Sequence, residues 1–105
     1  MLSYEQFVRS IEAERPPSVA NVALRALWHE RRGNVEAAHA LAEGDSSASG
    51  LWVRAYLRRK AGEADLAYHY WRAGVPEPSG DFDDEWSDIV HTILAETPVA
   101  NAYGA

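Results

Sequence analysis

The sequence contains no cysteine among its 105 residues and a single lysine beside nine arginines. The missing cysteine excludes a disulfide framework, a thiolate metal site and a cysteine nucleophile. No stretch approaches the roughly 20 consecutive apolar residues that span a membrane, and the first residues lack the basic and apolar regions of a secretory signal. We therefore expect a cytoplasmic protein.

The charge balance is acidic, because 16 Asp and Glu residues against 10 Lys and Arg residues give a formal net charge of −6. Such a surface repels phosphate groups, whose neutralisation requires Lys and Arg. Binding to nucleic acid or to an anionic membrane is therefore not expected. The composition, with 47% hydrophobic and 25% charged residues, is that of a globular protein, and the length suits one domain.

Apolar residues recur at helical spacing along the chain, and no segment alternates as a strand does. Six helices are predicted, over about residues 4–14, 19–32, 35–43, 51–60, 63–73 and 83–96. Ser3 and Gln6 form a capping box for the first, Ser18 is expected to cap the second, and the last is expected to end at Thr97-Pro98. The fold class is therefore all-α, with residues 1–97 as one domain and residues 98–105 as a loose tail.

The second and third predicted helices match the fourth and fifth at an offset of 29 residues. Gly33 falls on Gly62, and Ala38 falls on Ala67. A left-handed glycine ends a helix and reverses the chain, and a small residue lets the next helix pack closely. Two stacked helix-turn-helix hairpins are expected, closed by the first and last helices as terminal caps.

A glycine, an acid, an alanine and large aromatic residues follow one another at Gly62, Glu63, Ala67, Tyr70 and Trp71. This pattern resembles the turn and second helix of a tetratricopeptide or Sel1-like repeat, and Gly33, Asn34 and Ala38 match it more weakly. The usual repeat length is about 34 residues, so the 29-residue period departs from it. The resemblance implies a helical scaffold with a binding role.

A second resemblance rests on Trp28-His29, Gly33-Asn34, Ala38-His39, the segment 52–63 and Trp86. These residues are similar to a family of small uncharacterised bacterial and fungal proteins, over about residues 23–94. Histidine holds in that family the positions that Arg54 and Arg58 hold here, so a shared histidine-based site is not implied. The family brings no established activity with it.

Aromatic residues are numerous for so short a chain, and helical spacing favours a place in the core for most of them. The fifth predicted helix is expected to turn four residues inward: Ala64, Ala67, Tyr70 and Trp71. Because this helix is apolar over more than one face, Tyr68 or Trp71 is expected to be the exposed aromatic residue. The acids at 81–85 are interpreted as a solvated face at a helix N-terminus.

The first functional hypothesis is a protein-interaction module with its contact face on the second and fourth helices. Trp and Tyr suit interfaces, and a pair of arginines suits a carboxylate. The candidate contacts are Trp28, His29, Arg54, Arg58 and Tyr68. The partner is a protein segment or a second copy of the chain. A separate alternative is a homodimeric structural protein with no other role. The alternative interpretation is that the basic helix with Arg54, Arg58, Arg59 and Lys60 is balanced by the acids of residues 81–88.

The second hypothesis is a small-molecule or metal-dependent site between the hairpins, with or without enzymatic activity. Its lining would be His39, Tyr56, Arg59, Glu63 and Trp86. The four histidines fall on four predicted helices without the spacing of metal ligands, so neither a metal site nor a cofactor is predicted. The sequence has no nucleophile elbow and no phosphate-binding loop, so no catalytic residue is predicted.

Overall fold

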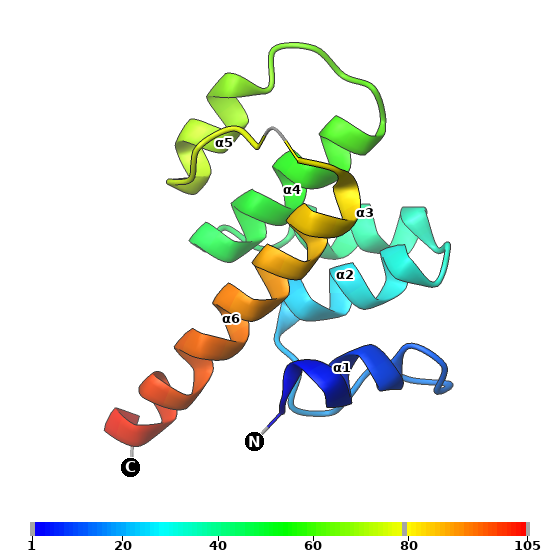
Figure 1. Ribbon diagram of the computed structural model, residues 1–105, viewed down its shortest axis with the longest axis vertical. Coiled ribbons are helices and arrows are strands. Elements are labelled where there is room, and N and C mark those ends of the chain that lie inside the picture. Colours follow the sequence, from blue (N-terminus) through cyan, green and yellow to red (C-terminus); the bar gives the residue numbers. More distant parts are fainter. Residues whose placement is uncertain (1, 79, 105) are drawn as a thin grey trace.

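The computed structural model describes the backbone of residues 2–78 and 80–104, with side chains up to Glu96. This part of the chain forms six α-helices and no strand (Figure 1), which confirms the predicted all-α class. The helices are α1 (Tyr4–Ser10), α2 (Val22–Arg31), α3 (Val35–Glu43), α4 (Ala48–Lys60), α5 (Ala67–Ala73) and α6 (Phe82–Gly104).

Helix α1 begins with the predicted capping box. The Ser3 side chain accepts a hydrogen bond from the Gln6 amide, and the Gln6 side chain accepts one from the Ser3 amide. The helix is shorter than predicted, since it ends at Ser10 and the following residues form turns ahead of the two prolines. Phe7 is its fully buried residue and anchors it to the core.

Helix α2 begins later than predicted, because its cap is Asn21 and not Ser18. The Asn21 side chain accepts a hydrogen bond from the Leu24 amide at 2.9 Å. A turn after the prolines, closed by the Ala20 amide on the Pro17 carbonyl, occupies the residues ahead of it. Val19 therefore lies outside the helix and is 68% exposed, so its predicted place at the start of the second helix was wrong.

The two predicted hairpins are present, α2 with α3 and α4 with α5, and each reverses at the expected glycine. Gly33 and Gly62 have φ of +84° and +80°, the left-handed conformation that glycine adopts without strain. After each glycine the next amide bonds back to a carbonyl five residues earlier, Asn34 to His29 and Glu63 to Arg58. These bonds satisfy carbonyls that the helix ends leave open.

The second hairpin differs from the prediction at both of its helix starts. Helix α4 begins earlier, at Ala48, because the Ser47 side chain caps it. Helix α5 begins later than expected, after Asp65, which has φ of +59° and interrupts the helical path. As a result Ala64, Ala67 and Trp71 are exposed, whereas Tyr70 and Ala73 are buried. The prediction of four inward-facing residues was wrong except for Tyr70.

Helix α6 crosses both hairpins and completes the core (Figure 1). Its buried stripe packs with residues of α1, α2, α3 and α4, and consists of Trp86, Ile89, Val90 and Ile93. The prediction that α6 ends at Thr97-Pro98 was wrong, because its backbone is helical to Gly104. The alanines near the proline favour helix and offset part of its cost. Within the described residues no helix is long and apolar enough to traverse a bilayer.

Candidate functional site

Trp28, the first residue of the predicted contact face, is buried between α1 and α2. Its indole N–H donates to the Ser10 carbonyl at 2.9 Å, and the Arg32 guanidinium lies 4.6 Å from its ring centroid. Arg32 also donates to the carbonyls of Ile11 and Ala13. The Trp28 side chain thus fixes the end of α1 and offers no surface to a partner. His29 packs edge-on against the same ring.

Arg54 and Arg58, the two arginines of the predicted contact face, form hydrogen bonds and ion pairs within the fold. Arg54 donates to the carbonyls of Ala42 at 2.7 Å, Glu43 at 2.6 Å and Asp45 at 3.3 Å, and so caps the C-terminus of α3 from the neighbouring helix. Arg58 forms ion pairs with Glu43 at 3.6 Å and Glu63 at 3.2 Å. The balance by the acids of residues 81–88 is therefore confirmed for Arg59, which is ion-paired with Glu85. Arg54 and Arg58 are balanced instead by the end of α3 and by Glu63.

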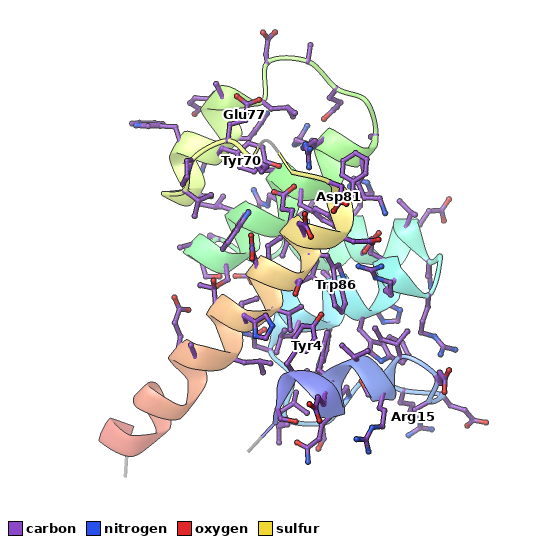
Figure 2. All side chains as sticks on the ribbon, in the orientation of Figure 1. Tyr4, Arg15, Tyr70, Glu77, Asp81 and Trp86 are labelled. Carbon is purple, nitrogen blue, oxygen red and sulfur yellow. The ribbon has the colours of Figure 1, made fainter. Side chains whose placement is uncertain are left out.

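The residues predicted to line a small-molecule site make contacts in different parts of the molecule. Tyr56 and Arg59 both pack on the Phe82 ring, whereas Glu63 is paired with Arg58. His39 lines a small cavity between α2, α3 and α4. Trp86 lies at the centre of the molecule (Figure 2), where its indole donates to the Leu27 carbonyl and the Arg31 guanidinium covers its ring. Tyr56 and Arg59 thus share Phe82 as a neighbour.

A buried carboxylate that the sequence did not reveal joins α4, α5 and α6. The Glu85 side chain is 1% exposed and accepts hydrogen bonds from three groups. They are the Arg59 guanidinium at 3.0 Å, the Tyr70 hydroxyl at 2.7 Å and the Trp52 indole at 3.2 Å. Burial, and next the hydrogen bond to Glu85, raise the pKa of Tyr70 above its ordinary value. Tyr70 lies between α5 and α6 in Figure 2.

A second buried carboxylate lies at the centre of the first hairpin's contact with α4. Glu30 of α2 is ion-paired through Oε2 with Lys60, the one lysine of the chain. Its side chain is 4% exposed. Burial, and next the charge of Glu30, raise the pKa of the adjacent Tyr56.

Both buried acids occupy positions on an apolar stripe, and this is the signal that sequence reasoning missed. Glu85 precedes Ile89 by four residues, and Glu30 follows Ala26 by four. Residues four apart share a helix face, so each acid faces the core with its apolar neighbour.

The four histidines lie on four different helices, as predicted: α2, α3, α5 and α6. Within residues 2–78 and 80–96, no group of three or more His, Asp and Glu side chains is placed to hold a metal ion. An apolar groove of about 340 Å³ between α1 and α6 has Trp86 on its lining, and one of about 400 Å³ lies beside Trp52 and Glu85.

The outer face of α5 carries two large aromatic residues that are more exposed than Phe82, the third exposed one among the described side chains. Trp71 is 74% exposed and Tyr68 58%, which confirms the expectation that an aromatic residue of this helix is exposed. Their rings stack with centroids 6.1 Å apart, and the Arg72 guanidinium lies 5.9 Å from the Tyr68 ring. We call Tyr68, Trp71 and Arg72 the α5 face. Of the predicted contact residues, Tyr68 is the one that belongs to it.

No family model matches the chain, and no curated protein or solved structure matches it significantly.

Proposed function

We propose that this protein is an interaction module that binds an acidic segment of another protein through the α5 face. The observation that carries the proposal is the exposure of Trp71 and Tyr68, stacked side by side on one helix. Large aromatic side chains bury much of their area in most proteins. Trp, Tyr and Arg are also the residues that contribute most to binding energy at interfaces, and the α5 face consists of one of each.

The α5 face is held in place before any partner arrives. Tyr70, the next residue after His69, points the other way and is fixed by Glu85 at 2.7 Å. Ala73 is also buried, and the Val75 amide closes the end of the helix on the Tyr70 carbonyl. A rigid surface loses less conformational entropy on binding, which favours affinity.

The charge of the α5 face determines the kind of partner. Six of the nine arginines donate to carboxylates or carbonyls within the fold: Arg25, Arg31, Arg32, Arg54, Arg58 and Arg59. Arg72, in contrast, forms no ion pair with any described residue and is exposed. A guanidinium beside the Tyr68 ring suits a carboxylate next to an apolar or proline residue. An acidic partner segment fits this arrangement.

The resemblance of the hairpins to tetratricopeptide repeats agrees with a binding role. The repeat pattern at Gly62, Glu63 and Tyr70 is the part of the chain that carries both the resemblance and the α5 face. This support is an analogy of fold, and it identifies no partner.

Fluorescence anisotropy with short acidic peptides tests the proposal. The set combines Asp or Glu with Pro, Tyr or Leu, and each peptide has an analogue in which Asn or Gln replaces the acids. Acidic peptides are expected to bind, and their amide analogues more weakly. Trp71→Ala should lower the affinity by about 30-fold, the loss of a typical interface hot spot. Arg72→Gln should weaken binding and flatten its dependence on salt.

Val19→Ala is the matched control, because Val19 is similarly exposed but lies ahead of α2. Its affinity should equal that of the wild type. Failure of every acidic peptide to bind, or binding that survives Trp71→Ala, contradicts the proposal. Sedimentation of the protein alone gives another outcome: a dimer that Trp71→Ala dissociates makes a second copy, and not a foreign segment, the occupant of the α5 face.

A further inference from the structure

A groove lies between α4, α6 and the loop that joins α5 to α6 (Figure 1). Its volume is about 400 Å³, within the range of about 300–1,000 Å³ that is typical of small-molecule sites. Trp52 of α4 lies on one side, and Val75, Pro76 and Pro78 of the loop form an apolar wall. Helix α6 adds the carboxylate of Asp88.

Trp52 is half-buried, and no aromatic ring or cationic side chain of the described residues lies against its ring. The rings of the other three tryptophans are covered by a guanidinium or an aromatic ring: Trp28 by Arg32, Trp86 by Arg31 and Trp71 by Tyr68. The face of an indole attracts a cation, and Trp is the best of the aromatic residues for this contact. The groove therefore contains an indole face that is open to a cationic ligand.

The Trp52 ring is held in position before a ligand arrives. Its indole N–H donates to Glu85 at 3.2 Å, and Glu85 is itself fixed by Arg59 and Tyr70. The Glu85 side chain is 1% exposed and ion-paired with Arg59, so it orients the indole and does not touch a ligand. A ring that is already oriented loses little conformational entropy on binding.

The charges of the groove select the sign of the ligand. Asp88 is exposed, and its carboxylate forms no hydrogen bond or ion pair with any described residue. Among the described residues that line the groove there is no Lys or Arg, and His91 is the remaining ionisable one. The groove therefore attracts a cation and repels a carboxylate or a phosphate.

The apolar wall selects the type of cation. The side chains of Val75, Pro76 and Pro78 offer no hydrogen-bond acceptor. The N–H groups of a primary ammonium or a guanidinium would lose water against this wall without compensation. A quaternary ammonium has no N–H group, and its methyl groups suit apolar neighbours and an indole face.

From the uncovered Trp52 ring, the apolar wall and the unpaired Asp88 carboxylate, we infer that this groove is a binding site for a small quaternary ammonium ion. The positive charge of the ion lies over the indole and faces Asp88, and its methyl groups contact Pro76 and Pro78. No residue of the α5 face lines the groove, so the site is independent of the proposed function.

Choline is a suitable probe, because two analogues separate its charge from its methyl groups. In 3,3-dimethyl-1-butanol a carbon replaces the charged nitrogen, and in ethanolamine N–H groups replace the methyl groups. Titration of the labelled protein is followed by NMR at the Trp52 indole N–H and at the backbone amides of Val75 and Thr92. Choline is expected to shift these signals saturably, with a dissociation constant in the millimolar range. Both analogues should bind about tenfold more weakly, the alcohol for lack of charge and ethanolamine for lack of methyl contacts.

Two variants remove the contributions of the groove, and each has a matched control. Trp52→Leu removes the indole face and should weaken choline binding at least about tenfold. Asp88→Lys reverses an exposed charge and should weaken it to a similar extent, about tenfold, and it decides the question if Trp52→Leu does not fold. Glu36→Lys makes the same charge change at an exposed acid of α3, and Trp71→Leu removes the exposed tryptophan of the α5 face. Both controls should bind choline as the wild type does.

An unsaturable response of the wild type to choline overturns the inference. Equal affinity for choline and 3,3-dimethyl-1-butanol overturns the selection of a cation, and equal affinity for choline and ethanolamine overturns the selection of a quaternary one. Unchanged choline affinity in both Trp52→Leu and Asp88→Lys, or its loss in Trp71→Leu, overturns the location of the site. A trimethyllysine peptide that binds more tightly than choline overturns the assignment to a small ion, because the occupant is then a protein side chain.

Discussion

Tyr70 and Glu85 form the buried hydrogen bond that attaches α5 to α6, and its removal should lower stability measurably. The bond is 2.7 Å long, and Tyr70 is 1% exposed. A hydrogen bond to a charged group contributes about 1.5–3 kcal/mol. Since the Trp52 indole still donates to the same oxygen after Tyr70→Phe, the carboxylate is not left without partners. A loss of about 2 kcal/mol is therefore expected, near the lower part of that range.

For a domain of this size, such a loss lowers the melting temperature by about 8–16 °C. Urea unfolding followed by circular dichroism gives the free energy of unfolding, and an unchanged slope shows that both states keep their compactness. In the Glu85→Gln background the same Tyr70→Phe change should cost about 1 kcal/mol less, because the acceptor is then neutral.

Tyr68→Phe is the control, since Tyr68 lies on the same helix but is exposed. It should change the free energy of unfolding by less than about 0.5 kcal/mol. A Tyr70→Phe protein as stable as the wild type would refute the role given to this bond. An equal cost of Tyr70→Phe with and without Glu85→Gln would refute its dependence on the charge.

Three further changes test the fold. Tyr56 and Tyr70 have raised pKa values, so above pH 10 the unfolded chain loses protons that the native state keeps. The free energy of unfolding should then fall with a slope that approaches about 2.7 kcal/mol per pH unit once the unfolded tyrosines are ionised, and about half of that slope in Tyr70→Phe. Urea unfolding from pH 9 to about pH 12 measures both slopes. Gly33→Ala should lower the free energy of unfolding by about 1–2 kcal/mol, because Gly33 has a φ of +84°. Gly44→Ala is the control and should leave it unchanged, because Gly44 has a φ of −85°. Equal losses in the melting curves of the two variants would contradict the left-handed reversal at Gly33. Arg54→Gln should lower the free energy of unfolding by about 1–3 kcal/mol, because it leaves the carbonyls at the end of α3 without their donor. Hydrogen exchange at the amides of residues 45–47 should become faster in the same variant.

The turns between helices were predictable because their chemistry is local. Gly33 and Gly62 each predict a left-handed chain reversal from local sequence alone. Ser3 and Gln6 likewise predict a capping box within four residues. The start of α2 was harder to predict, because Ser18 and Asn21 are both good N-cap residues. The turn after the two prolines selects Asn21.

The candidate site was only partly predictable, because its contacts join residues far apart in the sequence. Arg54 bonds to carbonyls of the preceding helix, which a side-chain pattern does not display. Glu85 was interpreted as one of several acids at a helix N-terminus, although its spacing from Ile89 places it on the buried face. Trp71 is exposed because α5 packs on the core through Tyr70 and Ala73, and the sequence, apolar over more than one face of this helix, does not show which face is buried.

The indole N–H signals of the four tryptophans test the binding role of the α5 face most directly. Three of these groups are hydrogen-bonded inside the fold, to Ser10, Glu85 and Leu27, and belong to Trp28, Trp52 and Trp86. Trp71 is exposed. On titration with an acidic peptide, the account predicts a shift of the Trp71 indole signal while the other three stay in place. Shifts of the Trp28, Trp52 or Trp86 signals with an unmoved Trp71 signal would contradict it.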